Sequence, residues 1–260
     1  MRKFISLLLI TLLVFSLVPV SLAANSQTSK TIYQAEEITD INELYNRALN
    51  GKTDKITYPK AKLKNKEGKP LNVKVYSTTQ LLKIEKLKDG KEKKSYVTTT
   101  FAVVDEIELS SEKKSSNSRV KNRYFLNDYK YVEKWDPSKG VKAYQTVYWT
   151  VTSIGDDDYY DMYKVKGGWT VSSSYSVQNC KVNIGQNGFY NGGYTISQAL
   201  TKYNVLIIYD YNVPPEWKPI SKGMVGANSY GSVRKGTSST TYDLWLENFI
   251  INDYSVEFPR

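Results

Sequence analysis

The sequence predicts an all-β protein, mainly an antiparallel β-sandwich, with one short helix near the N-terminus. Tyrosine is abundant, with 22 Tyr in 260 residues, and its ring suits the half-buried surface of a strand. From residue 143 onward, short apolar runs recur between Gly, Asn, Asp and Pro, as in sandwich proteins. Residues 40–50 alone have clear helical periodicity, so we expect a single helix.

The first 23 residues have the layout of a secretory signal peptide. Arg2 and Lys3 precede an apolar run over residues 7–18, and Ser21 and Ala23 provide small residues at the two positions that signal peptidase inspects. The run is shorter than the roughly 20 residues of a membrane-spanning helix. We therefore expect a secreted, extracellular protein with no transmembrane segment after cleavage, rather than a retained membrane anchor.

Charge is distributed unevenly along a chain whose formal net charge is +10. Residues 24–143 carry 25 Lys and Arg against 16 Asp and Glu, whereas residues 144–260 carry 9 against 10. We expect two parts, a basic region over 24–142 and a sandwich domain over 143–260. Outside a cell, the basic region would attract anionic cell-wall polymers. Alternatively, its lysines keep the protein soluble and its strand edges unpaired.

The lack of histidine and the single cysteine exclude several chemistries. Neither a Ser-His-Asp triad, a Cys-His dyad nor a histidine-ligated zinc site can form. Cys180 lies in a strand-like run and is expected to be a small buried side chain, although an intermolecular bridge or a reactive thiol is an alternative. Carboxylate-pair glycoside hydrolysis survives as a catalytic route. Its candidate acids are scattered: Asp161, Asp210, Glu216, Asp243 and Glu247.

The basic region contains a helix and a hairpin. Asp40 and Glu43 form a capping box for a helix over 40–50, and Asn50-Gly51 provides its stop signal. Asp89-Gly90 stands between two strand-like runs and predicts a β-hairpin over 71–109. The arms are rich in threonine, so a membrane-active hairpin is an alternative to an ordinary one.

Seven strands are expected in the second half. Gly167-Gly168 is interpreted as a hairpin turn and residues 186–194 as a Gly/Asn-rich loop. The expected strands are 143–154, 159–165, 168–175, 177–184, 203–213, 223–235 and 240–251.

Residues 143–252 resemble an uncharacterised β domain found at the C-terminal end of secreted proteins of Gram-positive bacteria. The likeness rests on the sequences at 163–170, 226–229, 233–238 and 242–248. It implies a β fold and an extracellular location, and it carries no known activity or ligand. The turn-forming residues of these segments account for much of the likeness.

Two groups of residues are candidate sites. The aromatic residues of the Gly/Asn-rich loop and of a proline-rich loop could stack on sugar faces: Phe189, Tyr190, Tyr194 and Trp217. The acidic cluster is interpreted first as a solvated turn, and calcium binding through Asp156, Asp158 and Asp161 is the alternative. No other cofactor is expected.

The leading hypothesis is therefore a non-catalytic extracellular protein that binds the cell envelope, through an anionic wall polymer or a carbohydrate. The alternatives are a carboxylate-based glycan hydrolase and a membrane-active factor that uses the hairpin. Nucleic acid is not an expected partner, because the basic region contains no recognisable binding module.

Overall fold

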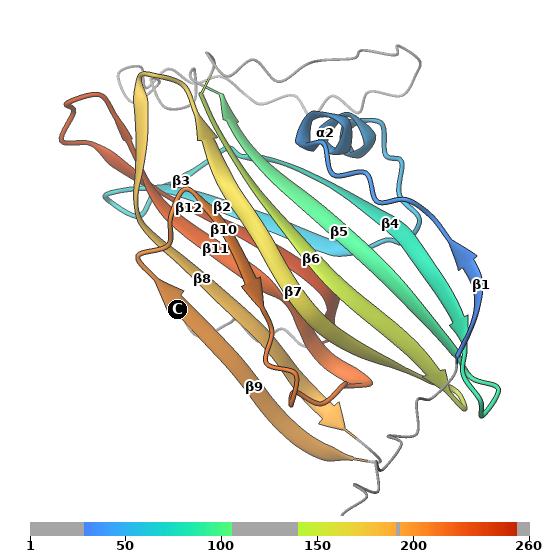
Figure 1. The fold of residues 1–260 in the computed structure, drawn as a ribbon. Coiled ribbons are helices and arrows are strands. Elements are labelled where there is room, and N and C mark those ends of the chain that lie inside the picture. Colours follow the sequence, from blue (N-terminus) through green and yellow to red (C-terminus); the bar gives the residue numbers. More distant parts are fainter. Residues whose placement is uncertain (1–28, 106–139, 191–192, 254–260) are drawn as a thin grey trace, which may run out of the picture.

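In the computed structural model, the chain forms two six-stranded antiparallel sheets packed face to face, with one helix on the outside (Figure 1). The structure describes residues 29–105, 140–190 and 193–253. The all-β sandwich prediction is confirmed. The predicted signal peptide and the end of the predicted hairpin, residues 106–109, lie outside the described residues.

Sheet A has the strand order β1-β4-β5-β6-β7-β10, and sheet B has the order β3-β2-β12-β11-β8-β9. The strands of sheet A are β1 (Lys30–Gln34), β4 (Lys74–Lys86), β5 (Glu92–Asp105), β6 (Gly140–Ile154), β7 (Asp157–Val171) and β10 (Ile208–Asn212). The strands of sheet B are β2 (Tyr58–Asn65), β3 (Pro70–Leu71), β8 (Tyr175–Tyr190), β9 (Tyr194–Tyr203), β11 (Lys222–Lys235) and β12 (Thr241–Asn252).

The basic region and the second half share both sheets. β5 pairs with β6 from Asp105–Gly140 to Lys93–Thr152, and β2 pairs with β12 in the other layer. The expected boundary at residue 143 therefore lies inside β6 rather than in a connection.

Alternation along the strands separates the core from the outer faces. On β6, Val147 and Trp149 point between the sheets and are fully buried, while Thr146 and Tyr148 point outward. Sheet B supplies Ile184, Leu244 and Leu246 to the same core. Both layers thus bury one apolar face against the other.

Helix α2 (Ile41–Leu49) packs on the outer face of sheet A, which confirms the predicted helix (Figure 1). The Asp40 carboxylate accepts hydrogen bonds from the backbone N–H groups of Asn42 (2.9 Å) and Glu43 (2.8 Å), so it caps the first turn. At the other end, Gly51 has φ +64°, a conformation that glycine adopts at low cost. The apolar side of the helix covers Phe101 on β5.

The predicted hairpin is formed by β4 and β5, with Gly90 at φ +83° in its turn. It is held between β1 and β6 within sheet A.

The prediction of a turn at Gly167-Gly168 is wrong. Both glycines lie within the single strand β7. A Cβ on Gly167 would lie 2.2 Å from the Tyr209 hydroxyl, and one on Gly168 would lie 2.6 Å from the Ile207 carbonyl oxygen. The glycines are therefore required for the close approach of β10, and the chain does not reverse there. The strand β9 was not expected, and β8 continues to Tyr190 through most of the expected loop.

An ammonium group is enclosed by three rings at one end of the sandwich. Lys55 Nζ lies 5.6 Å from the ring centroid of Tyr96, 5.2 Å from that of Trp149 and 5.1 Å from that of Tyr160. We call these four residues the Lys55 cage. Each contact is a cation–π interaction, and the three rings come from three adjacent strands of sheet A. The cage therefore attaches the connection between α2 and β2 to the interior.

A buried amide links the two sheets. Asn248 of β12 is fully buried, and its Nδ2 donates to the backbone oxygens of Thr98 (3.1 Å) and Gln145 (3.0 Å) in sheet A. A second amide, that of Gln186 on β8, accepts from the backbone N–H of Met162 on β7 (2.8 Å). These bonds fix the position of one layer on the other, because hydrogen bonds are directional whereas apolar contacts are not.

We expect Asn248→Leu to lower the free energy of unfolding by about 1–3 kcal/mol, because two buried carbonyl oxygens lose a donor. Urea denaturation monitored by circular dichroism measures the change. Glu247→Gln is the matched control, since Glu247 points outward from the same strand and makes a single ion pair to Lys62 (3.5 Å). An equal loss in both variants would contradict the role of the amide.

A lysine buried beneath the helix makes stability depend on pH. Lys142 is 1% exposed, and its Nζ lies 5.0 Å from the Tyr45 ring and 5.8 Å from the Phe101 ring. Burial lowers its pKa from 10.5 to about 8, against the opposing effect of the Asp40 carboxylate. Between these two values the unfolded chain binds more protons than the folded chain, so stability rises with pH in this window.

Replacing Lys142 by Met should remove this rise. We expect the wild type to gain stability relative to Lys142→Met between about pH 8 and pH 10. Urea midpoints of the two proteins, measured across this range, test it. A constant difference between them would show that Lys142 does not titrate differently in the folded state.

Candidate functional site

Two hollows lie end to end on the outer face of sheet A. Tyr144, Thr146 and Tyr148 of β6 line the first, and Thr150 and Thr152 line the second. These are alternate residues of one strand and therefore share one face. The candidate site is this face, beside helix α2.

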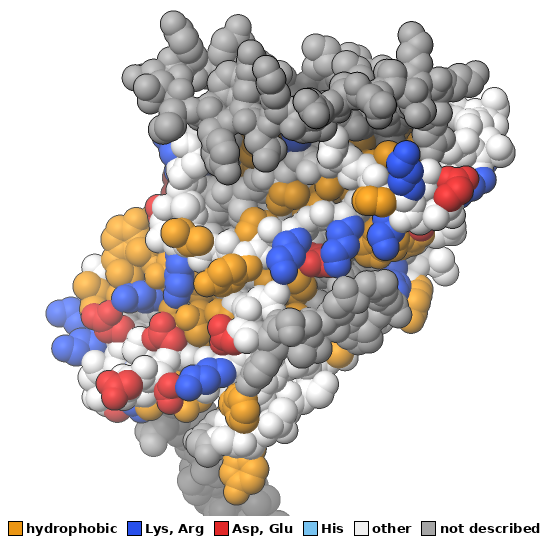
Figure 2. Space-filling model, turned by 180° about the vertical axis from the view of Figure 1, so that it is seen from behind, with side chains coloured by type: hydrophobic (Ala, Val, Ile, Leu, Met, Phe, Trp, Pro, Cys, Tyr) orange, Lys and Arg blue, Asp and Glu red, His pale blue; other side chains and the backbone are white. Residues whose placement is uncertain are grey.

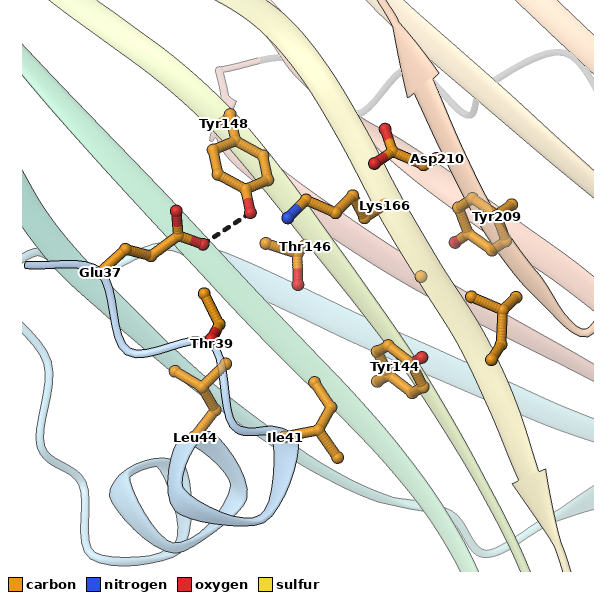
Figure 3. Close-up of a pocket in the computed structure, with 12 residues that line it drawn as sticks. Glu37, Thr39, Ile41, Leu44, Tyr144, Thr146, Tyr148, Lys166, Tyr209 and Asp210 are labelled. Atoms are coloured by element: carbon orange, nitrogen blue, oxygen red, sulfur yellow. Dashed lines mark hydrogen bonds between the residues drawn. The ribbon is translucent and has the colours of Figure 1, made fainter.

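The first hollow, which we call the Tyr148 pocket, has a volume of about 280 Å³ (Figure 3). Glu37 comes from the segment before α2, Lys166 from β7 and Asp210 from β10. The complete lining is Glu37, Thr39, Ile41, Leu44, Tyr144, Thr146, Tyr148, Lys166, Gly167, Ile208, Tyr209 and Asp210. Three sheet strands, the helix and the segment before it thus build one site.

Tyr148 is the centre of the polar contacts in this pocket. Its hydroxyl donates to Glu37 Oε1 at 2.6 Å, and Lys166 Nζ lies 4.6 Å from its ring centroid. Burial and the Glu37 carboxylate raise the pKa of Tyr148, so the hydroxyl stays protonated and keeps donating. The interaction also attaches the segment before the helix to the sheet.

Two carboxylates face this pocket from opposite sides, Glu37 and Asp210, with Tyr148 and Lys166 between them (Figure 3). Asp210 pairs with Lys164 at 2.9 Å, but its side chain is 53% exposed, so the pair contributes little to stability. The Asp210 carboxylate thus remains accessible to a ligand.

The second hollow, which we call the Asp161 pocket, has a volume of about 350 Å³. Gln186 Nε2 donates to Asp161 Oδ1 at 3.1 Å. Burial raises the pKa of Asp161, while the Gln186 bond and the charge of Lys93 act in the opposite direction. The lining is Lys93, Thr150, Thr152, Ile154, Tyr159, Asp161, Tyr190 and Pro219.

The predicted ligand-binding aromatics occupy different surroundings. Tyr190 lines the Asp161 pocket, so the structure brings it together with one predicted acid. Tyr194 is paired with Tyr190 across the β8–β9 turn and is 76% exposed. Phe189 is the preceding residue of β8 and is half-buried, and Trp217 packs against the main core. Their role in ligand binding stays a prediction.

The acidic cluster is held by hydrogen bonds. Asp158 accepts from Ser153 Oγ at 2.7 Å and from the Tyr160 hydroxyl at 3.5 Å. Asp156 lies in the turn between β6 and β7, and Asp161 contacts Gln186. In the part of the chain that the structure describes, no three acidic or cysteine side chains are grouped closely enough to hold a metal ion. Calcium binding by these aspartates stays a prediction.

Sequence reasoning missed most of the Tyr148 pocket. The outward residues of β6 did give a signal, because tyrosine and threonine alternate with apolar residues from Thr146 to Thr152. Glu37 gave none, since its partner Tyr148 is 111 residues away.

The outer face of sheet B is polar and aromatic as well. Tyr230 and Trp245 have ring centroids 5.0 Å apart, and the Tyr230 hydroxyl donates to Asp243 at 2.7 Å. Figure 2 shows lysine and acidic side chains interspersed on the side of the molecule that it displays. The polar groups named here are paired with one another on a sheet surface, whereas those of sheet A line two hollows.

Two further properties bear on function. Cys180 is buried and forms no disulfide, as expected for a small core side chain, and burial raises the pKa of its thiol. Over the described ranges, the helix is too short to traverse a bilayer.

Comparison of the chain with protein-family models, with curated proteins and with solved structures finds no match.

The pKa of Asp161 gives a test of the second hollow. Because the folded protein binds a proton there more readily than the unfolded chain, its contribution to stability is lost as pH rises through the folded-state pKa. Asp161→Asn preserves the oxygen that accepts from Gln186 and removes the titration. We expect the wild type to lose stability relative to this variant as pH rises above about 4, the ordinary pKa of an aspartate. Thermal midpoints of the two proteins that change in parallel with pH would contradict a raised pKa of Asp161 in the folded state.

Proposed function

We propose that this chain is a non-catalytic, extracellular binding protein whose ligand is a glycan of the cell envelope, held along the outer face of sheet A. The observation that carries the proposal is the row of outward Tyr and Thr side chains on β6, which runs through both hollows. The signal-peptide layout of residues 1–23 supports secretion.

The chemistry of the hollows suits sugars. Tyrosine rings offer flat apolar faces to a sugar ring, and their hydroxyls and those of threonine exchange hydrogen bonds with sugar hydroxyls. Glu37, Asp161 and Asp210 add acceptors, while Lys93 and Lys166 add positive charge for anionic substituents. Volumes of about 280 and 350 Å³ suit one small unit each, so a chain of linked sugars fits better than one large ligand.

The net charge of +8 that is left once residues 1–23, with Arg2 and Lys3, are removed adds a long-range attraction to anionic wall polymers. This attraction is screened by salt, whereas aromatic stacking and hydrogen bonding in the hollows are screened less. Two components of binding should therefore separate in a salt titration.

Retention on isolated cell walls is the first test. We expect purified protein to bind at low salt, to be partly released as salt rises, and to bind soluble wall oligosaccharides by calorimetry. Tyr163 is suited to mutation because it is 42% exposed and its ring lies 5.9 Å from that of Tyr148. Tyr163→Ala should weaken oligosaccharide binding roughly fivefold, from loss of an aromatic contact of about 1 kcal/mol.

Tyr58→Ala is the matched control, since Tyr58 is 55% exposed on β2 of the other sheet. Equal weakening by both variants, or no binding by the wild type to any wall fraction, would refute the proposal.

A second candidate function is glycan hydrolysis, favoured by the presence of Glu37 and Asp210 in one pocket. Glycosidases place two carboxyl groups on either side of the scissile bond. If the pocket is catalytic, the wild type releases reducing sugars from wall polysaccharide, and Glu37→Gln and Asp210→Asn each abolish the release while the fold is retained. Binding without product release favours the first function.

A further inference from the structure

Strand β9 leaves one edge of sheet B open. Its ten residues pair with β8 on one side, and no described strand lies on the other (Figure 1). Every second residue therefore directs its backbone N–H and C=O away from the sheet. Such an edge is a template for another strand.

The other three edges of the sandwich are protected. β1 has five residues and a register shift between Thr31 and Tyr33, and β3 has two residues and begins with Pro70. β10 has five residues and is soon followed by Pro214 and Pro215. Short strands, bulges and prolines are the usual devices that prevent edge-to-edge pairing. β9 has none of them: it is long, keeps an unbroken register with β8 and contains no proline.

The same side of the molecule is apolar and almost uncharged. Residues 204–207 cross from β9 to β10, with the N–H of Val205 bonded to Cys180 in sheet B and the carbonyl of Ile207 bonded to Trp169 in sheet A. Five large exposed side chains lie on this side: Tyr194 (76%) at the start of β9, and Tyr203 (71%), Leu206 (77%), Ile207 (51%) and Ile208 (70%) at or just beyond its end.

Residues 194–208 contain one charge, Lys202, whereas charged residues make up 24% of the chain. Two copies of a protein with a strongly positive net charge would meet least repulsion at this side.

We propose that two copies of this chain associate through β9, pairing antiparallel about a two-fold axis at Gln198. An isologous interface of this kind requires a strand that is complementary to itself. About Gln198, Thr195 faces Thr201, Ile196 faces Leu200 and Ser197 faces Ala199. Sheet B becomes a continuous twelve-stranded sheet across the pair.

Burial supports this register. Along β9, exposed and half-buried residues alternate, and Ile196 and Leu200 pack against the core between the sheets. Pairing Ile196 with Leu200 of the second copy keeps both on the inner side, so the core continues from one molecule into the next. The two-fold axis at Gln198 sets the Tyr203 end of β9 in one copy, with the adjoining residues 206–208, against the Tyr194 end in the other, so exposed apolar side chains from both ends of the strand meet across the pair. The second copy is thus the occupant that pairs the backbone edge and covers these side chains.

Sedimentation equilibrium of the purified protein tests the association. We expect a dimer at micromolar concentration, and tighter association as salt rises, because screening reduces repulsion between two basic molecules. This salt dependence is opposite in sign to that of binding to an anionic polymer, so the two can be told apart.

Ala199→Lys is the disrupting variant. It adds one positive charge per copy close to the two-fold axis, where the two new lysines lie within a Debye length of each other. We expect dimerisation to weaken at least tenfold. Gln34→Lys is the control, because Gln34 is exposed on β1, an edge of the other sheet. Circular dichroism establishes that both variants are folded.

The double variant Ser197→Cys/Ala199→Cys tests the register. In the proposed pairing, each new cysteine faces the other one of the second copy at a distance that a disulfide can span. Oxidation should give a covalent dimer on a non-reducing gel. A wild type that is monomeric at all concentrations, a dimer unaffected by Ala199→Lys, or no cross-link would each overturn the proposal.

Discussion

The buried amide of Asn248 determines how the two layers of this protein are positioned. Apolar side chains hold two sheets together at many relative positions, because dispersion and the hydrophobic effect have little directionality. An amide that must donate to two particular backbone oxygens, those of Thr98 and Gln145, selects one of these positions. Trp149 lies beside it and donates its indole N–H to Thr98 Oγ1 at 3.0 Å. The central strands β5 and β6 are thus fixed from the inside.

β6 connects this core to the candidate site. Its inward residues include Gln145 and Trp149, which take part in the buried polar contacts, and its outward residues line both hollows. A shift of β6 by one residue would exchange the two sets. The geometry of the binding face therefore depends on interactions on the opposite side of the same strand.

Sequence reasoning succeeded where the determining interactions are local. Asp40, Glu43 and Gly51 act within a few residues of the helix they delimit, and Asp89-Gly90 acts within its own hairpin. It failed at Gly167-Gly168 because glycine serves either a positive φ or a close approach, and the atoms that approach belong to Tyr209 and Ile207, some forty residues later. For the same reason Tyr190 and Asp161 were named separately, and their common pocket was not foreseen.

The charge asymmetry of the sequence also has a different meaning in three dimensions. The basic first half supplies β2 and β3 to sheet B and β1, β4 and β5 to sheet A, so the lysines of these described strands are spread over both layers. These strands present a diffuse positive field to an approaching polymer rather than one basic patch. Local recognition then has to come from the lining of the hollows.

The Lys55 cage has a consequence for small cations. Three rings around an ammonium group are the arrangement by which proteins recognise choline and methylated amines. Here the ring faces are already engaged by a side chain of the same chain, which is present at the high effective concentration of an intramolecular ligand. A dissolved amine would have to displace this built-in occupant before it could reach the ring faces.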